Sequence, residues 1–263
     1  MDLGLKGRPA LVAAASKGLG RACALALARE GAPVGICGRD EGNLKATRDE
    51  IAEETGATVV AIPADVSQEE DAVRFIREGA EALGGCQVLV ANSGGPPTGT
   101  FADLTDEDFR AALELNYFST IRMAREALPF MREAGYGRLI VIGSLAIKQP
   151  VANLLLSNSI RAGIAGWAKT LADEVGPEGI TVNVVLPGML LSDRVRFLLQ
   201  QRADEAGRTF EDQVDQESRS MPLRRLGDPQ ELGDVVAFLA SERASYLSGG
   251  FIQVDGGLYR GLL

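Results

Sequence analysis

The sequence predicts an α/β fold, in which a seven-stranded parallel sheet is covered by helices on both faces. Short runs rich in Val, Ile and Ala recur along the chain, and they are nearly continuous in apolar character, as in strands buried on both faces. Segments of helical length and periodicity separate these runs. No linker, repeat or low-complexity tract divides the chain, so residues 1–263 are expected to form one domain with a large core.

The strands are predicted in order at residues 10–14, 34–37, 58–63, 88–91, 138–142, 181–186 and 250–254. The helices between them are predicted at residues 18–30, 41–55, 69–83, 106–134, 151–175 and 229–239. Right-handed crossovers between parallel strands generate a doubly wound sheet, whose ligand crevice lies beyond the carboxyl ends of the strands. Each motif described below follows a predicted strand, so the motifs are expected to meet in that crevice.

Composition excludes several kinds of function. The chain contains no histidine, which rules out a histidine general base, a Ser-His-Asp triad and a His-ligated metal site. We therefore expect no metal. The net charge is −9, from 27 Lys and Arg against 36 Asp and Glu, and this balance argues against nucleic acid or an anionic membrane as a partner.

Cysteine usage and hydropathy indicate a cytoplasmic protein. Cys23, Cys37 and Cys86 are widely spaced and form no C-x-x-C pair, so they are interpreted as reduced thiols. No apolar run is long enough to span a bilayer, and residues 1–10 do not form a long apolar leader.

The first predicted strand leads through a small-residue turn into a helix, and this junction is the best candidate for a phosphate site. Amide groups at a helix N-terminus lack partners within the helix, and the helix dipole favours negative charge there. Gly18 and Gly20 allow the backbone to approach a phosphate closely. The alternative is that these glycines serve only the geometry of the turn.

Charged residues after the next two strands favour NADP over NAD. Arg39 stands after the second strand, where an NAD-binding protein usually holds the adenosine ribose with an acidic residue. A guanidinium suits a 2′-phosphate, and Lys17 can approach the same group. The alternative is that Arg39 is a solvated charge at a strand end. Asp65 follows the third strand and is either an acceptor for the adenine amino group or the N-cap of the next helix.

Several motifs in the same order resemble those of the short-chain dehydrogenase/reductase family, in particular its branch of 3-oxoacyl-acyl-carrier-protein reductases. The matching segments are Ala13-Ala14-Ala15-Ser16-Lys17-Gly18-Leu19-Gly20, Ala91-Asn92-Ser93-Gly94, Asn116, Ser144, Pro187-Gly188, Leu247-Ser248-Gly249 and Val254-Asp255-Gly256-Gly257. The resemblance extends from Leu5 to Tyr259 and implies a Rossmann-type dinucleotide-binding domain. It is therefore far more specific than any single motif.

The resemblance also implies roles for individual residues. Ser144 is expected to polarise a substrate carbonyl, and Asn116 to hold a chain of water molecules. The residues implied in binding NADP are Ser16, Lys17, Gly18, Leu19, Gly20, Arg39, Asp65, Val66, Asn92, Ser93, Gly94, Arg161, Pro187 and Gly188.

The chain departs from the family at two places. Ala13-Ala14 replaces Thr-Gly in the first turn, which matters if the second position needs a positive φ. In the family, a Tyr-x-x-x-Lys pair lies thirteen residues beyond the serine, with both side chains on one helix face. At that register the chain has Ser157 and Arg161.

The second departure changes the proton chemistry. The family's tyrosine, with a reference pKa of about 10, is brought toward neutrality by the lysine, whereas serine is a far weaker acid. Arg161 keeps the positive charge and can bond the ribose hydroxyls, but it does not relay a proton. Water, Ser157 or Lys148 is then left to supply the proton. Tyr117 would reach the crevice only if its helix were turned.

Residues 190–226 carry charges of both signs and a few apolar side chains, and at this position the family has a mobile helical lid over the substrate. We expect a lid here. The two long helices that contain Asn116 and Arg161 have apolar residues on more than one face, which is consistent with subunit packing. By resemblance, the chain is expected to form a homotetramer.

The sequence is compatible with two functions. The first is an NADP-dependent oxidoreductase that reduces a carbonyl, such as a 3-oxoacyl thioester, or oxidises the corresponding alcohol. The second is a non-catalytic NADP(H)-binding sensor or an inactive subunit of an oligomer. The pair Ser157/Arg161 separates them, because it weakens acid catalysis but not binding.

Overall fold

The computed structural model describes residues 1–262 and contains one seven-stranded parallel sheet with the order β3-β2-β1-β4-β5-β6-β7. Its strands are β1 Ala10–Val12, β2 Val34–Gly38, β3 Val59–Pro63, β4 Val88–Ala91, β5 Gly137–Ile142, β6 Ile180–Pro187 and β7 Phe251–Val254. All six neighbouring pairs are parallel, from β2 with β3 to β6 with β7. The predicted single Rossmann-type α/β domain is therefore confirmed.

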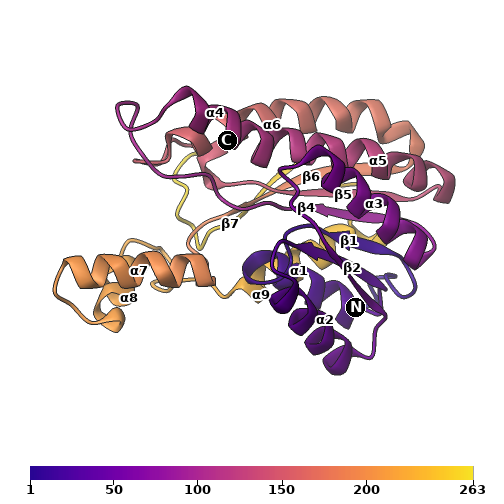
Figure 1. Cartoon of the computed structure of the whole chain (residues 1–263), viewed down its shortest axis with the longest axis horizontal. Helices are drawn as coiled ribbons and strands as arrows, with labels where there is room; N and C mark the ends of the chain where they lie inside the picture. Colours follow the sequence, from indigo (N-terminus) through magenta and orange to yellow (C-terminus); the bar gives the residue numbers. More distant parts are fainter. Residues whose placement is uncertain (263) are drawn as a thin grey trace.

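Helices cover both faces of the sheet, and one pair of helices extends away from it (Figure 1). The α-helices are α1 Gly18–Arg29, α2 Glu41–Thr55, α3 Glu69–Leu83, α4 Asp106–Leu113, α5 Ser119–Ala134, α6 Leu155–Val175, α7 Asp193–Glu205, α8 Phe210–Ser218 and α9 Pro229–Ala240. One layer consists of α1, α2 and α9, and the other contains α3, α5 and α6. The pair α7 and α8 projects beyond the carboxyl end of β6 (orange in Figure 1).

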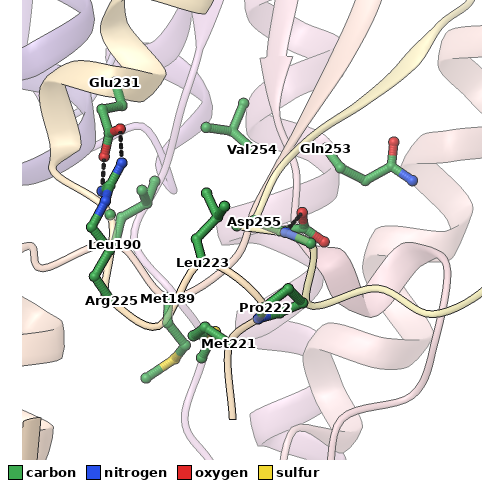
Figure 2. Close-up of a pocket in the computed structure, with 13 residues that line it drawn as sticks. Met189, Leu190, Met221, Pro222, Leu223, Arg225, Glu231, Gln253, Val254 and Asp255 are labelled. Carbon is green, nitrogen blue, oxygen red and sulfur yellow. Dashed lines mark hydrogen bonds and ion pairs between the residues drawn. The ribbon is translucent and has the colours of Figure 1, made fainter. Parts of the chain in front are cut away.

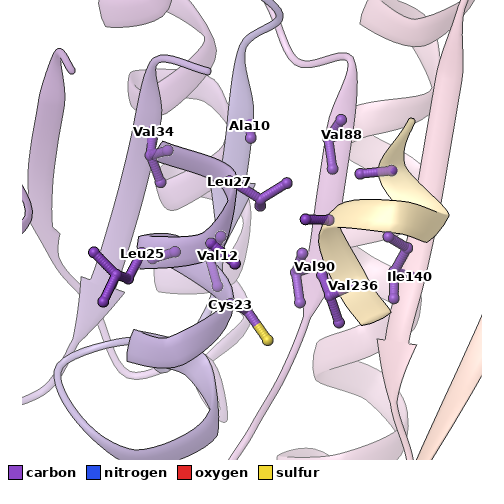
Figure 3. Close-up of a cluster of buried hydrophobic side chains, with 14 of the residues drawn as sticks. Ala10, Val12, Cys23, Leu25, Leu27, Val34, Val88, Val90, Ile140 and Val236 are labelled. Atoms are coloured by element: carbon purple, nitrogen blue, oxygen red, sulfur yellow. The ribbon is translucent and has the colours of Figure 1, made fainter. Parts of the chain in front are cut away.

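The core consists of two apolar clusters, one on each face of the sheet, because successive strand residues point to opposite faces. In β4, Val88 and Val90 contribute to the cluster under α1 and α9, whereas Leu89 contributes to the cluster under α3, α5 and α6. Figure 3 shows the first cluster, in which Leu27 of α1 and Val236 of α9 meet the strand side chains. This two-sided burial is the reason the strands are apolar at every position.

Two predicted helices differ from the structure. The helix predicted at residues 106–134 is interrupted by a π-helical turn, η1 Glu114–Phe118, between α4 and α5. The helix predicted at residues 151–175 begins only at Leu155, because Asn153 has a φ of 60°, outside the right-handed helical region.

The structure also shows the state of the cysteines and the character of the helices. Cys23, Cys37 and Cys86 are free and buried, and burial raises the pKa of each thiol, so they are held as unreactive thiols. Among residues 1–262, no helix combines the length and the apolar character needed to cross a bilayer.

Candidate active site

The turn between β1 and α1 leaves the first amide groups of the helix without a side-chain cap. Helix α1 begins at Gly18, no side chain caps its N-terminus, and its first turn contains no acidic residue. Asn92 supports the turn from β4, since its Nδ2 donates to the carbonyl oxygens of Ala13 and Ala14, both at 3.2 Å. The uncapped amides fit the phosphate of a dinucleotide.

Glycine is required at two positions of this turn. Gly18 has a φ of 59°, in the left-handed region. A Cβ at Gly20 would collide with the carbonyl oxygen of Ala14, so only glycine allows α1 to pack this closely on the turn. Ala14 itself has a φ of 48°, which confirms that the replaced glycine position of the family turn needs a positive φ.

Two exposed cations flank the end of β2, as the preference for NADP requires. The Arg39 side chain is 77% exposed, and its Nη1 lies 3.9 Å from Oδ2 of Asp65. Lys17 is exposed in the turn, where the Ser16 carbonyl accepts a hydrogen bond from Thr47 Oγ1 at 2.8 Å. Arg39 is therefore not buried in a structural ion pair and remains open to a ligand phosphate.

Asp65 forms a turn rather than capping a helix. Its Oδ1 accepts hydrogen bonds from the backbone amide and hydroxyl of Ser67, at 3.0 and 2.8 Å, and the N-cap of α3 is Gln68. The helix-capping alternative for Asp65 is therefore wrong. The side chain of Val66 is buried among core residues, so only its backbone can face a ligand.

The loop after β4 is connected to the π-helical turn through Asn116. Its Nδ2 donates to Ser93 Oγ at 2.7 Å and to the Gly94 carbonyl at 2.8 Å. Its Oδ1 is buried and has no hydrogen-bond partner within residues 1–262. Buried polar atoms without a partner are rare, and π-helical turns are frequent at functional sites, so Asn116 fits a position beside a ligand or water.

Two of the predicted catalytic side chains, Ser144 and Arg161, lie at the end of β5. Ser144 Oγ accepts a hydrogen bond from the Ala146 amide at 3.1 Å, which leaves its hydroxyl hydrogen free to donate. Ser157 is buried in α6, one turn before Arg161. Nη1 of Arg161 donates to the carbonyl oxygens of Ile142 and Gly143, at 2.9 and 3.1 Å, directly before Ser144.

The guanidinium of Arg161 is held in an environment that disfavours its charge. Burial and, to a smaller extent, the positive charge of Arg194 together lower the pKa of Arg161 to about 10. The side chain therefore stays cationic at neutral pH, and it remains a fixed charge rather than a proton relay.

Pro187 and Gly188 close the edge of the sheet beside β7. The Gly188 amide donates to the Val254 carbonyl at 3.0 Å, and a Cβ at Gly188 would lie 2.7 Å from the Cα of Asp255. The glycine therefore permits close packing between the ends of β6 and β7.

Leu19, another residue predicted to bind the coenzyme, lies in α1. Its side chain is partly buried and packs against the core cluster below that helix.

The segment at residues 190–226 forms two helices, α7 and α8, and its first turn reaches back to the sheet. Nη1 and Nη2 of Arg194 donate to the carbonyl oxygens of Gly95 and Pro96, at 2.8 and 3.1 Å. The sequence did not point to Arg194, because a charged residue in a charge-rich segment gives no periodic or motif signal.

A cavity of about 420 Å³ lies at the base of these helices (Figure 2). Met221, Leu223 and Val254 line it, and Arg225 and Glu231 form a doubly hydrogen-bonded ion pair at its side. None of the four residues predicted to be catalytic, Ser144, Asn116, Ser157 and Arg161, lines this cavity.

Lys148 and Tyr117, the other two side chains considered as proton donors, contact residues outside the predicted catalytic set. Lys148 Nζ lies 5.3 Å from the ring centroid of Tyr259, and it donates to the side-chain oxygen of Gln253 at 2.9 Å in the amide orientation that satisfies both ends of Gln253. Tyr117 packs beside α6, where a Cβ at Gly163 would lie 3.2 Å from its ring. Within residues 1–262, no group of three or more His, Cys, Asp and Glu side chains could hold a metal.

Known proteins match nearly the whole chain. Residues 13–259 match the family model of enoyl-(acyl carrier protein) reductase. The chain is 30% identical over 259 residues to the 3-oxoacyl-[acyl-carrier-protein] reductase FabG of Aquifex aeolicus, covering 98% of this chain and 100% of that protein.

Solved structures are equally similar. The L-sorbose reductase of Gluconobacter frateurii, complexed with NADPH and L-sorbose, superposes with a TM-score of 0.96 at 30% identity, covering 100% of both chains. A short-chain oxidoreductase from Pseudomonas aeruginosa PAO1, NADPH-bound and described as containing an atypical catalytic center, has a TM-score of 0.88 at 32% identity, covering 97% of both chains.

Proposed function

Because this chain belongs to the short-chain dehydrogenase/reductase family of oxidoreductases, we propose that it reduces a carbonyl with NADPH, or oxidises the corresponding alcohol with NADP. The observation that carries the proposal is the uncapped N-terminus of α1 beside exposed Arg39. The NADPH in the two related structures supports the same coenzyme. We place the protein in the cytoplasm, and we propose the two-helix segment 190–226 as a substrate lid.

The coenzyme is proposed to lie across the carboxyl ends of the strands. The turn from Ser16 to Gly20 would hold the diphosphate, and Arg39 with Lys17 would hold the 2′-phosphate. Asp65, Val66 and the segment Asn92-Ser93-Gly94 would border the adenosine and the nicotinamide ribose. Arg161, Pro187 and Gly188 would complete the nicotinamide end. When bound, the nicotinamide supplies or accepts the hydride.

During reduction, the carbonyl oxygen of the substrate becomes negative, and residues of this chain have to stabilise and protonate it. Ser144 donates its free hydroxyl hydrogen to that oxygen, because its Oγ already accepts the Ala146 amide. Arg161 supplies a permanent positive charge beside it, and a preorganised charge of this kind lowers the free energy of an oxyanion in a site shielded from water. The proton itself comes from water or from the hydroxyl of Ser157. Asn116, whose Oδ1 has no partner in the described structure, is placed to order that water.

This arrangement predicts an unusual dependence of rate on pH. Ser144 and Ser157 do not titrate in the accessible range, and Arg161, with a pKa lowered to about 10, keeps its charge below about pH 9. The turnover rate is therefore expected to stay constant between about pH 6 and 9. The turnover rate is measured as NADPH consumption at each pH with a panel of 3-oxoacyl thioesters, diketones and quinones.

The double variant Ser157→Tyr/Arg161→Lys tests the same site. It restores a titratable phenol, so its rate should depend on pH in the range where the parent is constant. If the rate of the unsubstituted protein depended on pH as steeply as that of the double variant, another group would have to donate the proton.

The absence of the family's tyrosine and lysine favours one other function, a non-catalytic NADP(H)-binding sensor or an inactive oligomer subunit. Saturable NADPH binding without turnover of any carbonyl by the parent, together with activity of Ser157→Tyr/Arg161→Lys, would establish this second function. Activity of the parent would exclude it.

A further inference from the structure

Two guanidinium groups from different helices lie at adjacent strand ends. Arg161 of α6 bonds the carbonyls of Ile142 and Gly143, which end β5. Arg194 of α7 bonds the carbonyls of Gly95 and Pro96, in the loop after β4. Strands β4 and β5 are neighbours in the sheet, so both side chains reach the same end of one strand pair.

These two cations have no acidic partner. Neither Arg161 nor Arg194 takes part in an ion pair within residues 1–262, whereas most other arginines of the chain do. After burial, the charge of exposed Arg194 is the second cause of the lowered pKa of Arg161, and no carboxylate offsets it. Two like charges held together without a counter-ion are unfavourable, and an anion between them would relieve the repulsion.

Both guanidinium groups also have unused donors. Each guanidinium has five N–H groups, and each one's hydrogen bonds within residues 1–262 go only to two backbone carbonyls. The remaining N–H groups are available in a fork that matches the two oxygens of a carboxylate.

We propose that Arg161 and Arg194 together bind a carboxylate of the substrate, so that this protein acts on oxo acids and their hydroxy acids. The inference rests on the proposed function and specifies its substrate class, in place of the neutral 3-oxoacyl thioester that the resemblance suggests. Binding of the acid would also hold the first turn of α7 against the loop after β4, with Ser144 left to contact the carbonyl.

The position of Arg161 favours the substrate over the coenzyme as the source of the anion, because the turn at Gly18 and Gly20, which suits a diphosphate, follows β1, and β4 separates β1 from β5 in the sheet. Arg194 lies nearer to that turn, since Ser192 at the N-cap of α7 has its Cβ 3.7 Å from a Cβ placed on Gly18, and the NADPH affinity of Arg194→Gln below decides its assignment. The pair instead lies at the ends of β4 and β5, where Ser144 and Asn116 are also found. A carbonyl compound held at Ser144 would therefore direct a neighbouring carboxylate toward Arg161 and Arg194.

The test compares each acid with its neutral ester. NADPH consumption is measured with 2-oxobutanoate and 4-oxopentanoate, with their methyl esters and with a neutral 3-oxobutanoyl thioester. The parent is expected to show a kcat/KM at least about 10-fold higher for one acid than for its ester. Arg194→Gln should remove that preference through KM. Arg196→Gln, which changes an exposed arginine on the same helix without side-chain bonds in the described structure, should leave the preference unchanged.

Calorimetry gives a readout that does not depend on turnover. The same acids are titrated into the NADPH-loaded protein, and Arg194→Gln is expected to weaken their binding about 10-fold or more while the Kd for NADPH stays within about 2-fold. Equal binding of acid and ester, or a loss of NADPH affinity in Arg194→Gln, would overturn the inference, the second by assigning Arg194 to the coenzyme diphosphate. Failure of the proposed function is distinct, because no saturable binding of NADPH would then be seen.

Discussion

Ala14 holds a backbone conformation that alanine rarely adopts, since its φ is 48° in the turn before α1. The left-handed region costs a residue with a Cβ about 1–2 kcal/mol, and the larger unfolded-state freedom of glycine offsets part of that cost. Ala14→Gly is therefore expected to stabilise the fold by about 0.5–1 kcal/mol, measured by urea unfolding. NADPH affinity should rise or stay equal.

Ala15→Gly is the matched control for this prediction. Ala15 is fully buried, and its φ is not positive, so the substitution removes packed apolar surface and adds unfolded-state freedom. It should destabilise the protein. If Ala14→Gly destabilised it to the same extent, the turn would not be strained at Ala14.

The sequence pointed to most of the individual site residues, because each follows a strand in a recognisable motif. Asn92, Ser144 and Gly20 lie where these motifs predict, and each has a contact that explains its type. Arg194 could not be found in this way, since its partners are backbone carbonyls about a hundred residues away. Such a contact depends on how the segment at residues 190–226 folds back and not on any local pattern.

At the scale of elements, an ion pair combined with a helix cap joins the end of the segment at residues 190–226 to α9. Glu231 in the first turn of α9 accepts two hydrogen bonds from Arg225, at 2.6 and 2.7 Å, and one from the Asp228 amide at 2.8 Å. These bonds lower the pKa of Glu231 to about 2, with the Arg225 bonds as the larger cause. The carboxylate therefore joins the end of residues 190–226 to the body of the protein.

Removal of this charge should destabilise the protein in a pH-dependent way. The pKa of Glu231 is lower in the folded than in the unfolded state, so its contribution to stability is present above about pH 4.5 and is lost as pH falls toward 2. The Glu231 side chain is 43% exposed, so Glu231→Gln is expected to cost only about 1 kcal/mol at pH 7. The cost should shrink when urea unfolding is repeated below pH 4.5.

Glu81→Gln is the control, because Glu81 is exposed on α3 and forms no ion pair within the described residues. It should change stability little at any pH. A cost of Glu231→Gln that did not vary between pH 7 and 3.5 would mean that the ion pair contributes nothing and only packing is lost.

Sequence periodicity predicted most helices, but it missed the interruption of one helix and the bounds of the short helix α8. A π-helical turn inserts one residue without changing composition, so residues 106–134 read as one helix although Glu114–Phe118 interrupts it. The helix α8 does have a signal, since Thr209 caps it by accepting the Asp212 amide at 3.1 Å. The spacing of those two residues could have located α8 inside the predicted lid.

At the scale of the whole molecule, the fold places the ends of its strands at one edge of the sheet, and that placement creates the site. The strand order places β4 between β1 and β5, so the turn at Gly18, the loop that begins with Asn92 and the end of β5 that Arg161 contacts follow three adjacent strands. The parallel sheet could be predicted from the sequence, because parallel strands buried on both faces are apolar throughout. The rule that crossovers are right-handed then limits the possible topologies.

The outer surface carries apolar side chains that a monomer would leave in water. Phe118, the last residue of the π-helical turn η1, is 39% exposed, and Phe238 of α9 and Leu247 are 38% and 44% exposed on another part of the chain. We predict a homotetramer that uses both faces, with a mass by light scattering of about four chains of 27.8 kDa each. Phe118→Glu should leave dimers, because it places a charge in one face only. A parent of monomer mass would contradict this prediction.

Isothermal titration with NADPH and NADH tests the central claim most directly, that a pyridine nucleotide binds at the carboxyl edge of this sheet. One saturable site per chain is expected, with NADPH bound about 10-fold or more tightly than NADH, and Arg39→Asp should abolish that preference without abolishing binding. No saturable heat with either nucleotide would contradict the account.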